Sequence, residues 1–209
     1  LIIFTSDNGP WLNFGNHAGS NGGLREGKGA SFEGGQREPC IMKWPGHIPE
    51  GTICNKLAST IDLLPTLAAI TNSPLPEKKI DGVNILPLLM GDENANPRQS
   101  FLYYYRKNSL EAVRKGDWKL VFAHPGRTYI GFKPGVDGFP GGTNENFPYE
   151  EGLYDLLREP GERFDVKEYY PEVVAELKKL ADEAREDLGD DIQKMEGRNR
   201  REPGRMLTK

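Results

Sequence analysis

The first ten residues constrain this chain most, because an uninterrupted apolar run there ends abruptly in polar residues. Residues 1–4 are all apolar, a pattern typical of a strand that is covered on both faces inside a parallel sheet. Asp7 and Asn8 follow, and Gly9-Pro10 prevents the strand from continuing. Ligands of open α/β sheets bind beyond the carboxyl ends of strands, so we expect a ligand site at Asp7 and Asn8.

Asp7 and Asn8 have the chemistry of ligands for a hard metal ion. The Asp7 carboxylate offers a charged oxygen and the Asn8 amide a neutral one, which suits Ca²⁺, or Mg²⁺, rather than Zn²⁺. The alternative is that Asp7-Asn8-Gly9 is only a turn tripeptide. The residues alone leave both interpretations open.

A glycine-rich loop follows, and it carries Lys28 between Gly27 and Gly29. A lysine is a compact cation with three donors, and glycine neighbours let its backbone approach an anion closely. The run from Gly22 begins like a phosphate-binding P-loop, but Gly29 stands where that motif needs Ser or Thr, which excludes a nucleotide site. An ordinary surface lysine is the alternative. His17 lies in the same loop and is a candidate catalytic proton donor, although a satisfied or exposed loop histidine is the favoured interpretation.

Composition excludes two classes of partner. No apolar run approaches the roughly 20 residues of a membrane span. The net charge is −4, and no basic block precedes the C-terminal tail, so neither a membrane nor a nucleic acid is expected as a partner.

Cys40 and Cys54 are the two cysteines, and they either pair in an exported protein or stay as buried free thiols.

The remaining pattern predicts an α/β protein with a second, antiparallel part. Helices are expected after Thr60 or Asp62 and from Pro171 to Gly189. Strands are expected at 39–44, 101–105, 112–113, 118–122 and 153–157, with a hairpin turn at Gly116-Asp117. Residues 124–149 read as a long loop, either a lid beside a substrate or a surface insertion. The predicted divisions are 1–96, 97–189 and a charged tail, 190–209.

Several separate motifs occur along the chain: TSDNG at 5–9, GLREGK at 23–28, FEGGQREP at 32–39, WPG at 44–46, DLLPTL at 62–67, RKGDWKL at 114–120 and LYDL at 153–156. Together they resemble the formylglycine-dependent sulfatases of the alkaline phosphatase superfamily, of the arylsulfatase A and N-acetylgalactosamine-6-sulfatase type. The resemblance covers about nine tenths of the chain, in the order of the family's C-terminal half.

The resemblance implies roles for three residues. Asp7 and Asn8 match one pair of the family's calcium ligands, and Lys28 matches the lysine that contacts the sulfate group. It implies the C-terminal part of an alkaline-phosphatase-like α/β sheet, with a small antiparallel subdomain packed on a C-terminal helix. Glu33, Arg37 and Pro39 match a recurring motif of the family whose role is structural, and an internal ion pair is expected to hold the loop. Export to a periplasm, a lysosome or the extracellular space is also implied.

One part of the family's site is absent from these residues. The formylglycine precursor is a Cys or Ser that opens a C/S-x-P/A-x-R motif, and neither Cys40 nor Cys54 begins one. We therefore expect a preceding N-terminal half to carry the nucleophile, and residues 1–209 alone to be inactive. The expected substrate is a sulfated small molecule or glycan. A phosphodiesterase or phosphonate hydrolase of the same superfamily and a non-catalytic binding module are the alternatives.

Overall fold

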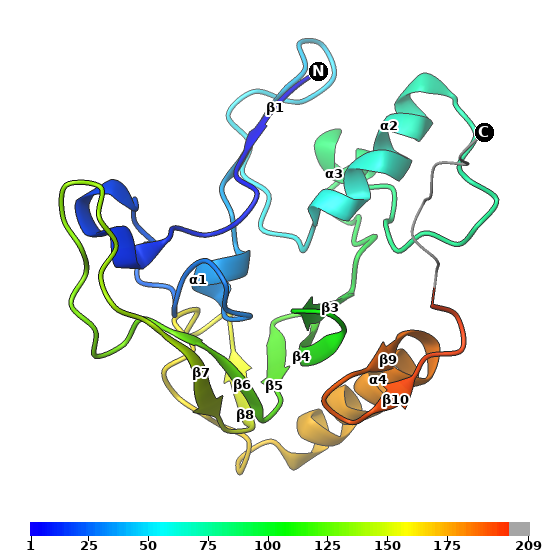
Figure 1. The fold of residues 1–209 in the computed structure, drawn as a ribbon. Helices are drawn as coiled ribbons and strands as arrows, with labels where there is room; N and C mark the ends of the chain where they lie inside the picture. Colours follow the sequence, from blue (N-terminus) through cyan, green and yellow to red (C-terminus); the bar gives the residue numbers. More distant parts are fainter. Residues whose placement is uncertain (201–209) are drawn as a thin grey trace, which may run out of the picture. The chain divides into compact units, whose positions relative to one another are not determined.

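The computed structural model describes residues 1–200, and contacts within the chain separate two compact units. Unit 1 comprises Leu1–Asp7 and Glu38–Phe101, and unit 2 comprises Asn8–Arg37 and the chain from Leu102 onward. The units are therefore interleaved in sequence. The glycine-rich loop belongs with the C-terminal residues and not with the strand that precedes it. Figure 1 shows the fold coloured along the sequence.

Unit 1 contains one small sheet and short helices. Strands β1 (Ile2–Thr5) and β2 (Cys40–Lys43) pair antiparallel, with Ile2 opposite Lys43 and Thr5 opposite Cys40. The helices are η2 (Thr60–Asp62), α2 (Leu63–Thr71) and α3 (Leu86–Leu89). The predicted strand at 39–44 and the helix after Asp62 are confirmed.

Two expectations for unit 1 are wrong for this chain. Ile2 and Phe4 are 67% and 68% exposed, and the described partner of β1 is an antiparallel strand, so β1 is not covered on both faces of a parallel sheet. An apolar strand is buried only if other segments cover it, and the described residues of unit 1 do not. Cys40 and Cys54 are free and exposed thiols, neither paired nor buried.

Asp62 organises the middle of unit 1. Its buried carboxylate accepts hydrogen bonds from the amides of Ser59 and Val83, at 2.9 and 2.8 Å, and from Arg98 Nε at 2.8 Å. Ser59 and Asp62 form a capping box, which satisfies backbone donors at the start of the helical segment. A single carboxylate therefore ties the helix start to the connector that follows it.

Unit 2 is built on a four-stranded sheet with the order β3-β4-β5-β8. Its strands are β3 (Ser100–Tyr105), which belongs to unit 2 from Leu102 onward, β4 (Ser109–Lys115), β5 (Trp118–Val121) and β8 (Gly152–Asp155). Lys115 pairs with Trp118 across the predicted turn at Gly116-Asp117, so this hairpin is confirmed. The antiparallel subdomain expected after residue 97 is present.

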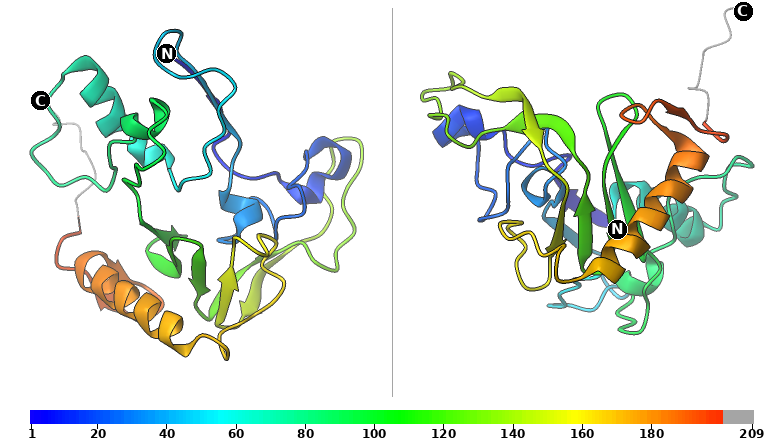
Figure 2. Two further views of the ribbon diagram at one scale, coloured as in Figure 1. Left: turned by 180° about the vertical axis from the view of Figure 1, so that it is seen from behind. Right: turned by 90° about the horizontal axis from the view of Figure 1, so that it is seen from below.

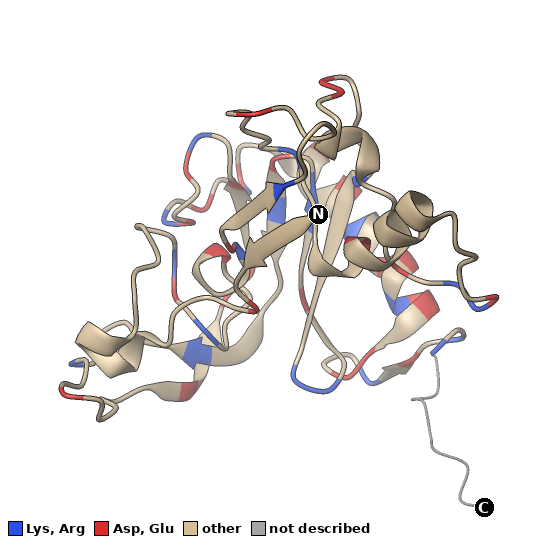
Figure 3. Ribbon diagram, turned by 90° about the horizontal axis from the view of Figure 1, so that it is seen from above, with Lys and Arg blue, Asp and Glu red and all other residues tan. Residues whose placement is uncertain are grey.

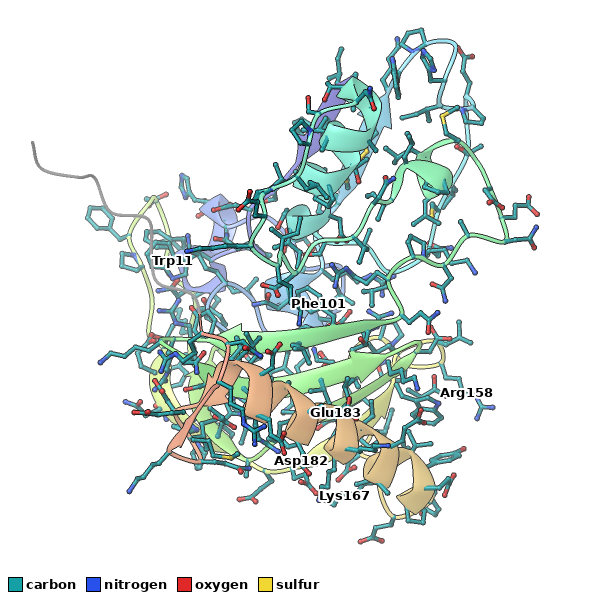
Figure 4. The ribbon with its side chains drawn as sticks, turned by 90° about the vertical axis from the view of Figure 1, so that its right-hand side faces the viewer. Trp11, Phe101, Arg158, Lys167, Asp182 and Glu183 are labelled. Carbon is teal, nitrogen blue, oxygen red and sulfur yellow. The ribbon has the colours of Figure 1, made fainter. Side chains whose placement is uncertain are left out.

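The long helix α4 (Pro171–Leu188) packs on one face of this sheet, as the views from behind and from the side show (Figures 2 and 4). Its start at Pro171 and its end before Gly189 match the sequence signals. The apolar core between helix and sheet comprises Leu110, Val113, Leu120, Phe122, Leu153, Leu177, Ala181 and Ala184. The predicted packing of helix on sheet is thus confirmed.

Residues 124–149 are not a structureless loop. They form a hairpin of β6 (His124–Thr128) and β7 (Asn144–Tyr149), which pair antiparallel with a bulge near Arg127. The remaining elements of unit 2 are η1 (Leu12–His17), α1 (Glu33–Gln36), β9 (Gly189–Asp190) and β10 (Met195–Glu196).

The first part of the predicted charged tail is folded. β9 and β10 pair, and the buried Asp190 accepts a hydrogen bond of 3.0 Å from Arg185 Nε. The start of the tail is therefore anchored at Asp190, because a buried carboxylate with an arginine partner fixes the chain, while most of residues 191–200 are exposed. Residues 201–209 of that tail lie outside the described residues. Lys and Arg are interspersed with Asp and Glu along the rest of the chain (Figure 3).

Candidate functional site

The residues that follow Asp7 are hydrogen-bonded to the loop that carries Lys28. The Gly9 amide donates to the carbonyl of Gly35 at 3.1 Å, and the Lys28 amide donates to the carbonyl of Pro10 at 2.9 Å. A Cβ on Gly9 would lie 1.9 Å from a backbone carbonyl oxygen of this loop, so the close approach requires glycine. Asn8 and Lys28 therefore lie on adjoining segments of unit 2.

The Lys28 ammonium is positioned by an aromatic ring and not by a carboxylate. Its Nζ lies 5.2 Å from the ring centroid of Trp11, within the range of a cation–π interaction. Trp11, labelled in Figure 4, makes an edge contact with Phe14 at 4.9 Å. Lys28 is half-buried and forms no ion pair with any other residue that the structure describes. Its charge is thus available to an anion.

The loop is fixed on both sides of Lys28 by buried polar contacts. Glu26 is buried, and its carboxylate accepts hydrogen bonds of 2.7 Å from Thr128 Oγ1 and from the Tyr149 hydroxyl. Farther along, the Ser31 hydroxyl donates to the Glu111 carboxylate at 2.6 Å. Buried charges of this kind are stable only when they are hydrogen-bonded, so they define one loop conformation.

Glu33 ends the loop in an ionic network against the sheet. Its carboxylate lies 3.1 Å from Lys119 Nζ and 3.4 Å from Arg114 Nη1, and it accepts a hydrogen bond of 3.1 Å from the Tyr103 hydroxyl. Lys119 also lies 2.9 Å from the Glu162 carboxylate. Glu33 therefore forms its ion pairs with cations of distant strands and not within the FEGGQREP motif.

The charges of this network shift each other's pKa. Burial alone would raise the pKa of Glu33, but Lys119 and Arg114 outweigh it and lower the pKa. Burial would likewise lower the pKa of Lys119, and the Glu162 and Glu33 carboxylates raise it instead. Burial raises the pKa of Glu162. The lysine therefore stays charged inside the protein.

Asp7 lies in unit 1, exposed and near a second carboxylate. Burial and, after it, the charge of Asp7 raise the pKa of Glu38. The buried Oε1 of Glu38 has no hydrogen-bond partner among the described residues. An excess of negative charge and an unsatisfied oxygen favour a cation, and the hard oxygens fit Ca²⁺. The described residues hold no group of three or more His, Cys, Asp or Glu suited to a metal, so they supply only part of a ligand set.

Comparison with known proteins identifies the family. Residues 96–204 match the family described as the C-terminal region of aryl-sulfatase. The chain belongs to this sulfatase family. Residues 27–122 also match the C-terminal family of N-sulphoglucosamine sulphohydrolase. The resemblance predicted from the sequence motifs is therefore confirmed.

Individual sulfatases are similar to this chain over most of its length. Arylsulfatase A of Homo sapiens is 40% identical over 190 residues, which cover 86% of this chain and 36% of the relative. N-acetylgalactosamine-6-sulfatase of Sus scrofa is 36% identical over 191 residues, with the same shares covered. The chain thus spans about a third of the length of the curated relatives it matches.

A solved structure confirms the predicted fold class. The PsFucS1 sulfatase from Pseudoalteromonas sp. has a TM-score of 0.72 and 26% identity, covering 88% of this chain and 36% of that one. The chain is therefore the C-terminal α/β part of a sulfatase, with its antiparallel subdomain and covering helix. None of the helices among residues 1–200 is both long and apolar enough to cross a membrane.

His17 of this sulfatase chain makes a structural contact. Its exposed ring accepts a hydrogen bond of 3.1 Å at Nδ1 from the Gly138 amide, in the loop between β6 and β7. The Asn13 carbonyl accepts two more from that loop, from Gly135 at 2.8 Å and Gly141 at 2.6 Å. The segment after Asp7 thus holds the hairpin loop in place. These contacts favour the interpretation of His17 as a loop histidine.

A cavity of about 540 Å³ lies within unit 2, beside the Lys28 loop. Its apolar lining includes Leu12 of η1 and Tyr129 and Phe132 of the hairpin, and its polar lining includes Arg25 and Glu26. Since Tyr129 also donates hydrogen bonds to the Glu26 carboxylate and to the Lys28 carbonyl, the segment between β6 and β7 both walls the cavity and supports the loop that carries the lysine.

Several residues of this site were missed from the sequence. Arg127 and Tyr129 belong to none of the motifs selected above, and Glu26 lies in the GLREGK motif but was given no role there. The contacts of these residues join positions about a hundred residues apart. Lys119 did carry a signal. It interrupts an apolar strand, and alternation along β5 places it on the face opposite Leu120, away from α4.

Proposed function

We propose that this chain is the C-terminal portion of a sulfuric ester hydrolase and supplies part of its sulfate and metal site. In this proposal Lys28 contacts the sulfate group, and Asp7 and Asn8 donate oxygens to Ca²⁺, or Mg²⁺. The observation that carries it is the Lys28 ammonium, partly exposed and without an ion-pair partner among the described residues, on a loop fixed by buried charges. The sulfatase family supports the same reading.

The proposed hydrolysis depends on stabilising the negative charge of the sulfate ester. A sulfate ester concentrates negative charge on its nonbridging oxygens as the sulfur is attacked, and a lysine at a fixed position stabilises that charge. The metal would supply Lewis-acid polarisation of the same oxygens. The nucleophile, a formylglycine, would come from residues outside this chain, because no C/S-x-P/A-x-R motif occurs in it.

The substrate is proposed as a sulfated small molecule or glycan. The cavity beside the loop, walled by Tyr129 and Phe132, has the apolar surface that an aryl group or the face of a sugar ring needs. Export from the cytoplasm is proposed from the family alone.

Kinetics of the full-length protein with Lys28→Ala test the proposal. We expect kcat/KM for a chromogenic aryl sulfate to fall by about 10²–10³, the usual effect of losing one charge-stabilising group. Lys56→Ala, an exposed lysine of unit 1, is the matched control and should leave kcat/KM unchanged. A Lys28→Ala enzyme as active as the wild type would contradict the role of Lys28. Faster turnover of phosphate diesters or phosphonates would favour the alternative hydrolase, and a full-length protein without activity would favour a binding module.

A further inference from the structure

Two side chains hold the backbone carbonyl of Lys28. They belong to Arg127 of β6 and to Tyr129, which directly follows β6. The Tyr129 hydroxyl donates to this carbonyl oxygen at 2.5 Å, and Arg127 Nη1 donates to it at 3.1 Å. A carbonyl oxygen has two acceptor sites, and here both are used by side chains instead of by secondary structure. The position of Lys28 is therefore set from the hairpin β6–β7.

Both donors are themselves fixed. Arg127 Nε donates to the two carboxylate oxygens of Glu145 on β7, each at 2.9 Å. The Tyr129 amide donates to the buried Glu26 carboxylate at 2.9 Å. Glu26 stands two positions before Lys28, so the hairpin grips the loop on both sides of Gly27. Neither donor can move without breaking another charged hydrogen bond.

The fit around Lys28 is also tight. A Cβ on the following residue, Gly29, would lie 2.6 Å from Arg127 Nη1. The guanidinium therefore occupies the space beside the loop, and the loop cannot shift toward it. The side chain of Lys28 lies against Trp11 instead. Tyr129 and Arg127 thus fix the backbone of Lys28 while its ammonium remains accessible.

We propose that Tyr129 and Arg127 are positioning residues for Lys28 in the hydrolysis of sulfate esters. This inference rests on the proposed function of Lys28. The polar groups of both residues are directed at the loop and at Glu145, so the Tyr129 hydroxyl and the Arg127 guanidinium act through Lys28, while the ring of Tyr129 lines the cavity. Their effect is to hold the ammonium where charge develops, and small displacements of such a group reduce rates strongly.

The test uses the full-length protein with Tyr129→Phe, which removes only the hydroxyl, and with Arg127→Lys as a second variant. Tyr104→Phe is the matched control. The Tyr104 hydroxyl also donates to backbone carbonyls of unit 2, at Gly189 (2.8 Å) and Ala184 (3.3 Å). Three quantities are measured: kcat/KM for an aryl sulfate, the inhibition constant of inorganic sulfate, and the midpoint of thermal unfolding.

We expect Tyr129→Phe to lower kcat/KM about tenfold and to weaken inhibition by sulfate to a similar extent, as the loss of one hydrogen bond would. Tyr104→Phe should lower the midpoint of thermal unfolding but change neither kcat/KM nor the inhibition constant of sulfate. In a Lys28→Ala background, Tyr129→Phe should change kcat/KM less than twofold, because two residues that act through one group are not additive.

A Tyr129→Phe enzyme that behaves like Tyr104→Phe would overturn the inference, and so would full additivity with Lys28→Ala. A loss of activity in Arg127→Lys that follows only from a lower folded fraction at the assay temperature would also count against it. A Lys28→Ala variant without effect would instead remove the proposed function on which the inference rests.

Discussion

The ammonium group of Lys119 lies 3.1 Å from the carboxylate of Glu33, and both side chains are buried. This contact joins β5 to the end of the loop that carries Lys28, across 86 positions of sequence. Lys119 also donates a hydrogen bond of 2.7 Å to the Ser31 carbonyl. The sheet of unit 2 therefore holds α4 on one face and the loop that carries Lys28 on the other.

Lys119→Met should destabilise the protein strongly. Removing the cation leaves the Glu33 and Glu162 carboxylates buried without compensation, which costs about 3–5 kcal/mol of unfolding free energy. Lys115→Met is the control, because Lys115 pairs with Glu176 on the surface, where an ion pair contributes little. Denaturant unfolding of the full-length protein measures both. Equal unfolding midpoints for the two variants would show that the buried network is not needed.

The same network predicts a dependence of stability on pH. Lys119 and Arg114 hold the pKa of Glu33 below its ordinary value of 4.5, so the folded protein releases this proton more readily than the unfolded chain. The stabilisation is fully present above pH 4.5 and is lost as the pH falls through the lowered pKa. Glu162, whose pKa is raised, contributes with the opposite sign.

Glu33→Gln should therefore flatten the curve of unfolding free energy against pH below about 4.5. Unfolding by urea at a series of pH values, for wild type and variant, measures this slope. A variant with the slope of the wild type would show that Glu33 is not a source of acid sensitivity.

Asp62 should be essential to unit 1. Asp62→Asn removes the charge that pairs with Arg98 and weakens the capping box, and breaking a buried pair costs about 3–5 kcal/mol. Asp92→Asn is the matched control, since the exposed Asp92 accepts one amide hydrogen bond, from Asn94 at 2.9 Å. The midpoints of thermal unfolding of the two variants are compared, and that of Asp62→Asn should be clearly lower. Similar midpoints for both variants would argue against an organising role for Asp62.

Asp7→Ala should weaken metal binding by the full-length protein. Removing one charged oxygen from the proposed Ca²⁺ ligands should raise the dissociation constant measured by calorimetry by at least about tenfold, the equivalent of one charge-assisted contact. Asp92→Ala should leave it unchanged. Chelation of the metal should lower sulfatase activity of the wild type. Unaltered Ca²⁺ affinity in Asp7→Ala would exclude Asp7 from the metal site.

Local patterns in the sequence determined the local structure and the family. Pro171 and Gly189 set the limits of α4, Gly116-Asp117 set a hairpin turn, and the order of short motifs identified a sulfatase. Such features depend on neighbours within a few residues, so they can be read without the fold. Asp7, Asn8 and Lys28 also came from the sequence as candidates, first from the end of the apolar run and the glycine-rich loop, and then from the resemblance.

Tertiary structure alone decided how Lys28 is held and which residues are buried. Sequence spacing could not show that Glu26 meets Tyr149, or that the Lys28 carbonyl meets Arg127, because these contacts join segments about a hundred residues apart. Nor could it show that the apolar β1 is exposed in this chain. Burial depends on which distant segments cover a residue, and the pairing of distant charges depends on the packing that brings them together.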